Sequence, residues 1–117
     1  MTNQTFSDYQ LACLRTTDSS RSQHDRVVIA TLGLVGEAGE FADALKKQIG
    51  HGHSADHAVL RAELGDVLFY VAELCNVMGW SMAQVAQEQV LKSLLRYQEG
   101  FCCEASLNRV DVEREDA

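Results

Sequence analysis

Proline is missing from the sequence, whose 117 residues also include only one tryptophan. Without proline, nothing in the chain forbids long uninterrupted helices. No run of about 18 apolar residues occurs, so we expect no segment that spans a membrane. Residues 1–8 lack the charged and apolar regions of a secretory signal. We therefore expect a cytoplasmic protein.

Basic side chains are few. Ten lysines and arginines stand against seventeen aspartates and glutamates, which gives a formal net charge of −7. A protein that binds a nucleic acid polymer or an anionic membrane would show a basic excess, so we expect neither partner. A nucleotide ligand remains compatible with this charge, because metal ions held by carboxylates can bind a polyanion.

The spacing of the cysteines excludes a common metal site. The four residues are Cys13, Cys75, Cys102 and Cys103, and no pair has the CxxC spacing of a zinc site. No export signal supports disulfides, so we interpret all four as reduced thiols. We expect Cys75 in the core, and the role of the adjacent pair is open.

Apolar residues recur at steps of three and four, which predicts amphipathic helices. The predicted helices cover roughly residues 6–15, 26–49, 58–78 and 82–97. Gly50 and Gly79 are placed to end the second and third of these helices. No alternation typical of a strand has useful length. The predicted fold is therefore all-α, a bundle of about four helices with short loops.

The length predicts a single domain, because two cores in 117 residues would each be too small to be secure. We place the domain at residues 1–101. Residues 102–117 are polar and charged, and we expect them to form a frayed tail.

Two pairs of carboxylates occupy unexpected faces of the long helices. Glu37 and Glu40 lie on the second predicted helix, and Glu63 and Asp66 lie on the third. A three-residue spacing puts each pair on one helical face, and the neighbours on those faces are largely apolar. Carboxylates there are costly unless they are paired or bind a metal. One such pair alone would be read as ordinary surface acids, but two pairs on consecutive antiparallel helices are expected to converge.

The ligand types favour a hard cation. The pairs contain neither His nor Cys, which suits Mg²⁺ or Mn²⁺ better than Zn²⁺. Lys47 lies beside Glu40 and could reach one carboxylate, but little other positive charge is nearby. Three glycines, Gly33, Gly36 and Gly39, lower the helix propensity of this segment. The close approach of a neighbouring backbone or of a ligand would explain why glycine occupies these positions. A di-iron or di-manganese bundle is disfavoured, because it needs Glu-x-x-His motifs that the chain lacks.

These motifs resemble those of the MazG-type all-α nucleoside triphosphate pyrophosphohydrolases. That family has ExxE on one helix and ExxD on the next, as in Leu32–Lys47 and residues 63–70 of this chain. The resemblance continues through Asn76–Ser81 to Lys92–Tyr97 and covers roughly residues 6–101. The two motifs together, with their flanking glycines, are specific, whereas either motif alone would be weak.

The resemblance implies a hydrolase acting on acid anhydrides. Mg²⁺, with Mn²⁺ as a substitute, would be held by the four catalytic carboxylates Glu37, Glu40, Glu63 and Asp66. Water would attack at the α–β linkage of a nucleoside triphosphate and release a nucleoside monophosphate and pyrophosphate. The family also implies a homodimer or homotetramer in which subunits complete each other's sites. The number of metal ions, the general base and the preferred base and sugar are open.

Four residues are candidates for binding the substrate. Lys92 and Arg96 match basic positions that the family uses around phosphates, although a solvated face explains them equally well. Gln89 departs from the Asn that the family commonly has there. Asn76 is a candidate for contacting the nucleobase, with a cap or surface amide as the alternative. Lys47 is the fourth candidate.

Other residues allow two interpretations. Glu73 could be a further ligand or base. His51, His53 and His57 are interpreted mainly as solvated, with a substrate lid or metal ligation as alternatives. Trp80 and Phe101 could stack on a base but are more typical of a core. The rival function is an acidic helical module that binds a nucleotide or a partner without turnover.

Overall fold

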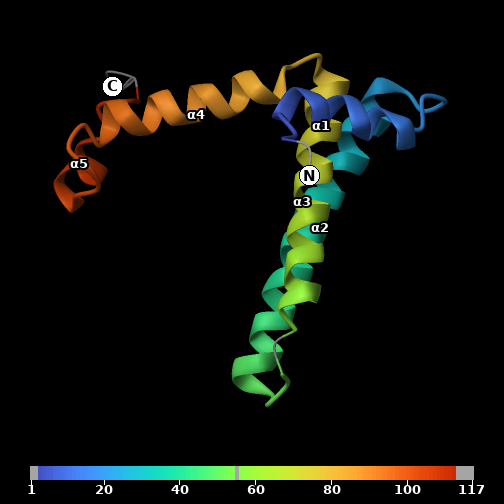
Figure 1. The fold of residues 1–117 in the computed structure, drawn as a ribbon, viewed down its shortest axis with the longest axis horizontal. Helices are drawn as coiled ribbons and strands as arrows, with labels where there is room; N and C mark the ends of the chain where they lie inside the picture. The colour runs from blue at the N-terminus through green and yellow to red at the C-terminus, as the bar shows by residue number, and fades with distance from the viewer. Residues whose placement is uncertain (1–2, 55, 113–117) are drawn as a thin grey trace. The chain divides into compact units, whose positions relative to one another are not determined.

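The part of the chain that the structure describes is all-α, as predicted (Figure 1). The computed structural model describes residues 3–54 and 56–112, and its two units divide between Met82 and Ala83. The helices are α1 (Phe6–Cys13), a 3₁₀ turn η1 (Leu14–Thr16), α2 (Gln23–Gly50), α3 (His57–Met78), α4 (Met82–Arg96) and α5 (Cys103–Asn108). None of these helices combines the length and apolar character needed to cross a membrane.

Side-chain caps set the starts of the first three helices. Thr5 and Asp8 form a reciprocal capping box at the start of α1. The Ser22 hydroxyl accepts from the Asp25 N–H at 3.1 Å, and the Asp56 carboxylate accepts from the Ala58 N–H at 2.9 Å. These bonds satisfy N–H groups that have no partner within the first turn of a helix.

The predicted ends of the long helices are right for α3 and slightly off for α2. Gly79 caps α3 in the left-handed region, with a φ of 72°. Gly50 was expected to cap α2 but is its last helical residue. The left-handed glycine is Gly52, with a φ of 71°, two residues further along the loop.

In the first unit, α2 packs along α3 and α1 packs on α3 (Figure 1). The buried core holds Cys13, Ala72, Cys75 and Met82, so Cys75 lies in the core as expected. The Gln10 amide joins α1 to the end of α3. It donates to Asn76 Oδ1 at 3.0 Å and to the Trp80 carbonyl at 2.7 Å, and it accepts from the Met82 N–H at 2.7 Å.

This core is small, and much apolar surface stays exposed on the single chain. The buried hydrophobic residues of the described chain are Cys13, Ala30, Ala72, Cys75, Val77 and Met82. Leu32 and Val35 of α2 are each 66% exposed. Trp80 is 53% and Phe101 75% exposed, so the interpretation of these two aromatics as core residues is wrong for the single chain.

The second unit contains most of α4, together with α5. Arg96 forms a bidentate ion pair with Asp111, with Nε–Oδ1 and Nη2–Oδ2 distances of 2.5 and 2.6 Å. Residues 103–108, which lie in the segment expected to fray, instead form α5. Its start is capped by the Cys102 thiol, which accepts from the Ala105 N–H at 3.4 Å. Residues 113–117 of the expected tail lie outside the described residues.

Candidate metal centre

A glycine lets α2 and α3 approach each other closely. A Cβ atom at Gly33 would lie 2.4 Å from the ring of Tyr70, a distance that no real side chain tolerates. The expected close approach is therefore found at Gly33, one turn before Glu37, although a side chain makes it. Gly36 and Gly39 have open space where a Cβ would be, so nothing within the described chain explains them.

Three of the four predicted carboxylates come together across this contact. One carboxylate oxygen each of Glu37, Glu63 and Asp66 lie within 4.8 Å of one another. We call these residues the carboxylate cluster. Glu37 and Glu63 are half-buried and Asp66 is exposed, so the cluster opens to solvent. The predicted convergence of α2 and α3 is what brings these oxygens together.

The neighbouring groups raise the pKa of Glu37 above its ordinary value. The largest cause is a hydrogen bond with the Glu63 carboxyl, which favours the protonated form of Glu37. Partial burial and the negative charges of Asp66, Glu63 and Glu40 act in the same direction. A divalent cation would relieve this repulsion, and three closely spaced carboxylate oxygens suit a hard ion of the Mg²⁺ type.

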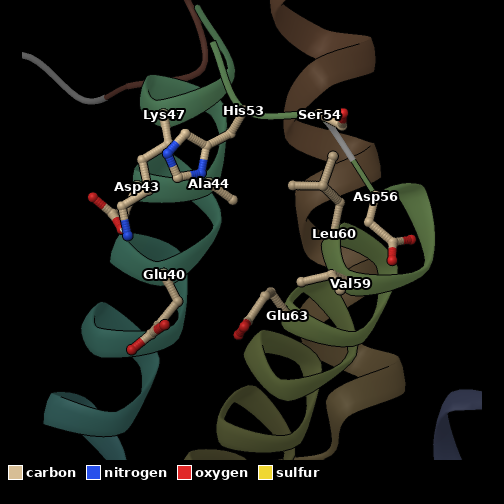
Figure 2. Close-up of a pocket in the computed structure, with 10 residues that line it drawn as sticks. All are labelled: Glu40, Asp43, Ala44, Lys47, His53, Ser54, Asp56, Val59, Leu60 and Glu63. Atoms are coloured by element: carbon tan, nitrogen blue, oxygen red, sulfur yellow. The ribbon is translucent and has the colours of Figure 1, made fainter. Parts of the chain in front are cut away.

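Glu40 lies next to this group and lines an adjoining cavity of about 290 Å³. We call it the Glu40 cavity. Figure 2 shows Glu40 on α2 and Glu63 on α3, on opposite sides of the space between the helices. The cavity therefore reaches the carboxylate cluster through Glu63, which belongs to both.

Lys47 also lines the Glu40 cavity, although its direct partner was not predicted. Its Nζ lies 2.8 Å from Asp43 Oδ2, and Lys46 Nζ lies 3.3 Å from Asp43 Oδ1. The hydrogen bond to Asp43 is the main cause that raises the pKa of Lys47, and the charge of Glu40 contributes in the same direction. Lys47 is thus a cation beside Glu40, as the sequence indicated, but it is paired with Asp43.

Two candidates further along α3 have partners of their own. The Asn76 side chain accepts from the Gln10 amide at 3.0 Å and donates to the Gln10 carbonyl at 3.2 Å. Glu73 accepts from the Thr17 hydroxyl at 2.6 Å. Neither residue belongs to the carboxylate cluster. A base contact by Asn76 and a ligand role for Glu73 remain predictions.

The basic pair on α4 belongs to the second unit. Lys92 is exposed, and Arg96 is engaged by Asp111. Gln89, which departs from the family pattern, donates to the Ser93 hydroxyl at 3.0 Å. Phosphate contacts by Lys92 and Arg96 remain predictions.

Asp43 and Asp56 line the Glu40 cavity but were not singled out from the sequence. Asp43 could have been found, because it lies three residues after Glu40 and four before Lys47, on the same helical face. Asp56 gave no such signal, because it is the N-cap of α3 and lies outside the helical repeat.

Comparison with known proteins identifies the family of the chain. Residues 29–101, more than half of the chain, match the family model of the MazG nucleotide pyrophosphohydrolase domain. The Gene 37 protein of Mycobacterium phage L5 is 39% identical over 83 residues, which cover 68% of this chain and 73% of that protein. No solved structure matches the chain significantly. The carboxylate cluster lies within the matched residues, and the chain belongs to the MazG nucleotide pyrophosphohydrolase domain family.

Proposed function

We propose that this chain is a Mg²⁺-dependent pyrophosphohydrolase that converts nucleoside triphosphates, ribo or deoxy, to nucleoside monophosphates and pyrophosphate. The observation that carries the proposal is the gathering of Glu37, Glu63 and Asp66 oxygens within 4.8 Å, with Glu40 on the adjoining cavity. The family to which the chain belongs supports the reaction class.

The carboxylates need a cation to accept this substrate. A triphosphate carries about four negative charges at neutral pH, so the acidic site alone would repel it. In the proposal Glu37, Glu40, Glu63 and Asp66 hold Mg²⁺, and Mn²⁺ is expected to substitute for it. When bound, the cation offsets the phosphate charge and makes the phosphorus more electrophilic.

The residues of the chain have two tasks in this reaction. The carboxylate side chains position the scissile linkage, and one of them accepts the proton of the attacking water. The bond between the α-phosphorus and the α–β bridging oxygen breaks, and its electron pair leaves with pyrophosphate. Lys47, which lines the Glu40 cavity, is a donor to the departing phosphates.

The remaining substrate contacts are proposed for Lys92, Arg96 and Asn76. A phosphate contact by Arg96 would use guanidinium donors other than the Nε and Nη2 groups that bond to Asp111. A base contact by Asn76 would use the hydrogen-bonding capacity that Gln10 leaves free. A homodimer or homotetramer is part of the proposal, because a second chain could cover the exposed apolar side chains of α2.

A panel of canonical and modified nucleoside triphosphates tests the proposal. We expect pyrophosphate and nucleoside monophosphate in equal amounts with Mg²⁺, and neither product in excess chelator. Failure to release pyrophosphate from any nucleotide would overturn it. Partner or nucleotide binding that is unchanged in chelator would then favour the module without turnover.

A further inference from the structure

Two of the cavities along the contact between α2 and α3 differ in chemistry. The Glu40 cavity is lined by Glu40 and Glu63, so it opens directly onto the proposed metal ligands. The second cavity, of about 180 Å³, is lined by residues that include Arg26, Phe69 and Tyr70. We call it the Arg26 cavity. None of the four carboxylates lines it.

The difference in lining indicates which end of a nucleotide each cavity would hold. The β- and γ-phosphates carry most of the negative charge of the substrate, so they suit a wall that contains proposed metal ligands and the cation Lys47. That condition selects the Glu40 cavity. The Arg26 cavity combines the aromatic rings of Phe69 and Tyr70 with charged side chains. Aromatic rings can stack on a planar base, and the charged side chains can form hydrogen bonds with its edge.

The Glu40 cavity contains a donor that the proposed function does not use. His53 lines it together with Lys47, and Figure 2 shows both side chains on the α2 side of the cavity. The loop is fixed there by its backbone, because the N–H groups of His51 and His53 donate to the Lys47 carbonyl at 3.0 and 3.2 Å. Gly52 makes the turn between the two histidines, with a φ of 71°.

The charged groups around His53 leave it available to an anion. Lys47 is paired with Asp43, and Asp43 also pairs with Lys46. Asp56 and Glu63 line the α3 side of the cavity, and Glu40 lines the α2 side. The His53 ring makes an edge contact with the His51 ring, with centroids 6.4 Å apart, and no ion pair of the His53 ring is found among the described residues. An imidazole N–H can therefore donate to a phosphate oxygen, and such a bond to an anion is among the stronger hydrogen bonds.

We propose that the Glu40 cavity is the pyrophosphate pocket of the site and that His53 contacts the terminal phosphate of the substrate. This inference rests on the proposed function and deepens it, because it assigns the leaving group to one of the two cavities. His53 forms and breaks no covalent bond in this role. It donates a hydrogen bond to an oxygen whose negative charge is retained when pyrophosphate leaves.

Calorimetric titration with pyrophosphate in Mg²⁺ tests this assignment without requiring turnover. We expect His53→Ala to weaken pyrophosphate binding by about tenfold, as for the loss of one hydrogen bond to a charged group. Binding of nucleoside monophosphate should change by less than about twofold, within ordinary scatter for an untouched contact. His24→Ala is the matched control, because His24 is an exposed histidine of α2 that lines neither cavity. It should leave both affinities unchanged.

Other outcomes would overturn the inference. Unchanged pyrophosphate binding in His53→Ala, with normal helicity by circular dichroism, would remove His53 from the pocket. A loss in Arg26→Ala with none in His53→Ala would assign the phosphates to the Arg26 cavity. If the wild-type protein binds pyrophosphate but hydrolyses no nucleotide, the proposed function fails while the pocket stands. If the wild-type protein hydrolyses nucleotides and His53→Ala binds pyrophosphate as tightly as wild type, only the pocket assignment fails.

Discussion

Glu37 of α2 and Glu63 of α3 each place a carboxylate oxygen within 4.8 Å of the other. Ionised carboxylates at this distance repel each other in the absence of a cation. The same closeness would let the two residues bind one ion. The repulsion without metal and the proposed affinity for metal therefore have one structural cause, and both can be measured.

Replacing Glu63 should separate activity from folding. Glu63 belongs to the carboxylate cluster and also lines the Glu40 cavity. We expect Glu63→Gln to lose more than nine-tenths of its turnover, at least about 1.4 kcal/mol of transition-state stabilisation. The metal-free protein should unfold at a higher temperature than wild type, because one repelling charge is gone, and Mg²⁺ should no longer stabilise it.

Glu40→Gln is expected to lose activity in the same way, and Glu88→Gln on α4 is the control. Glu88 is an exposed acid that accepts from the Gln84 amide at 3.1 Å within its own helix. Its replacement should leave pyrophosphate release intact. More than a tenth of wild-type activity in Glu63→Gln or Glu40→Gln would show that the ligand assignment is wrong.

The raised pKa of Glu37 predicts how stability depends on pH. The folded chain holds the Glu37 proton to higher pH than the unfolded chain, where the ordinary value is 4.5. The stability contributed by this group is therefore fully present below pH 4.5 and is lost as pH rises through the raised pKa. Thermal unfolding in chelator, at a series of pH values, should show this loss in wild type but not in Glu37→Gln. Parallel curves for the two proteins would contradict the prediction.

The helices and the carboxylate cluster were predictable because they depend on local periodicity. Apolar spacing placed α2 and α3 within a few residues, and the three-residue spacing of Glu37 and Glu40 set their common face. Two helices joined by a short loop must then lie antiparallel, which brings Glu63 to the same contact. Each step needs only the helical repeat and the length of the loop.

The remaining features depend on contacts that no periodicity encodes. His53 reaches the Glu40 cavity because its backbone N–H bonds to the Lys47 carbonyl, and a loop carries no helical repeat. The pairing of Arg96 with Asp111 requires the turn after α5, in a segment that its polar composition indicated would fray. Trp80 and Phe101 were expected in the core as single aromatics of a helical protein, yet both remain largely exposed.

The contact between Gly33 and Tyr70 predicts a destabilising substitution. Gly33→Ala would place a Cβ 2.4 Å from the Tyr70 ring. We expect a loss of about 1–3 kcal/mol of unfolding free energy, the usual effect of overpacking, despite the better helix propensity of alanine. Chemical denaturation measures this loss.

Gly39→Ala is the matched control, because a Cβ there meets nothing within 4 Å. It should leave stability unchanged or raise it by up to about 1 kcal/mol through helix propensity. Equal behaviour of the two variants would mean that Tyr70 can move away from α2 at little cost.

The exposed apolar side chains predict an oligomer. Leu32 and Val35 on α2 and Leu64 on α3 are all more than half exposed, and no large side chain of the described chain is fully buried. A second copy of the chain could cover these residues, because most soluble oligomers are built from identical chains. Sedimentation at micromolar concentration should therefore show a dimer or tetramer, and Leu32→Asp should shift it toward monomer. A stable, active species of 12.9 kDa would contradict the prediction.

The position of cleavage provides the sharpest test of how the substrate lies. If the distal phosphates occupy the Glu40 cavity, the carboxylate cluster next to it faces the α–β linkage. Water deprotonated by a carboxylate of the cluster then attacks the α-phosphorus, and pyrophosphate leaves toward Lys47 and His53. Hydrolysis in ¹⁸O-labelled water should therefore put the label in the nucleoside monophosphate. Attack at the β-phosphorus would give the same products with the label in pyrophosphate, which would place the cluster beside the β-phosphate instead. Release of orthophosphate as the first product would reveal attack at the γ-phosphorus, and the proposed reaction would be wrong.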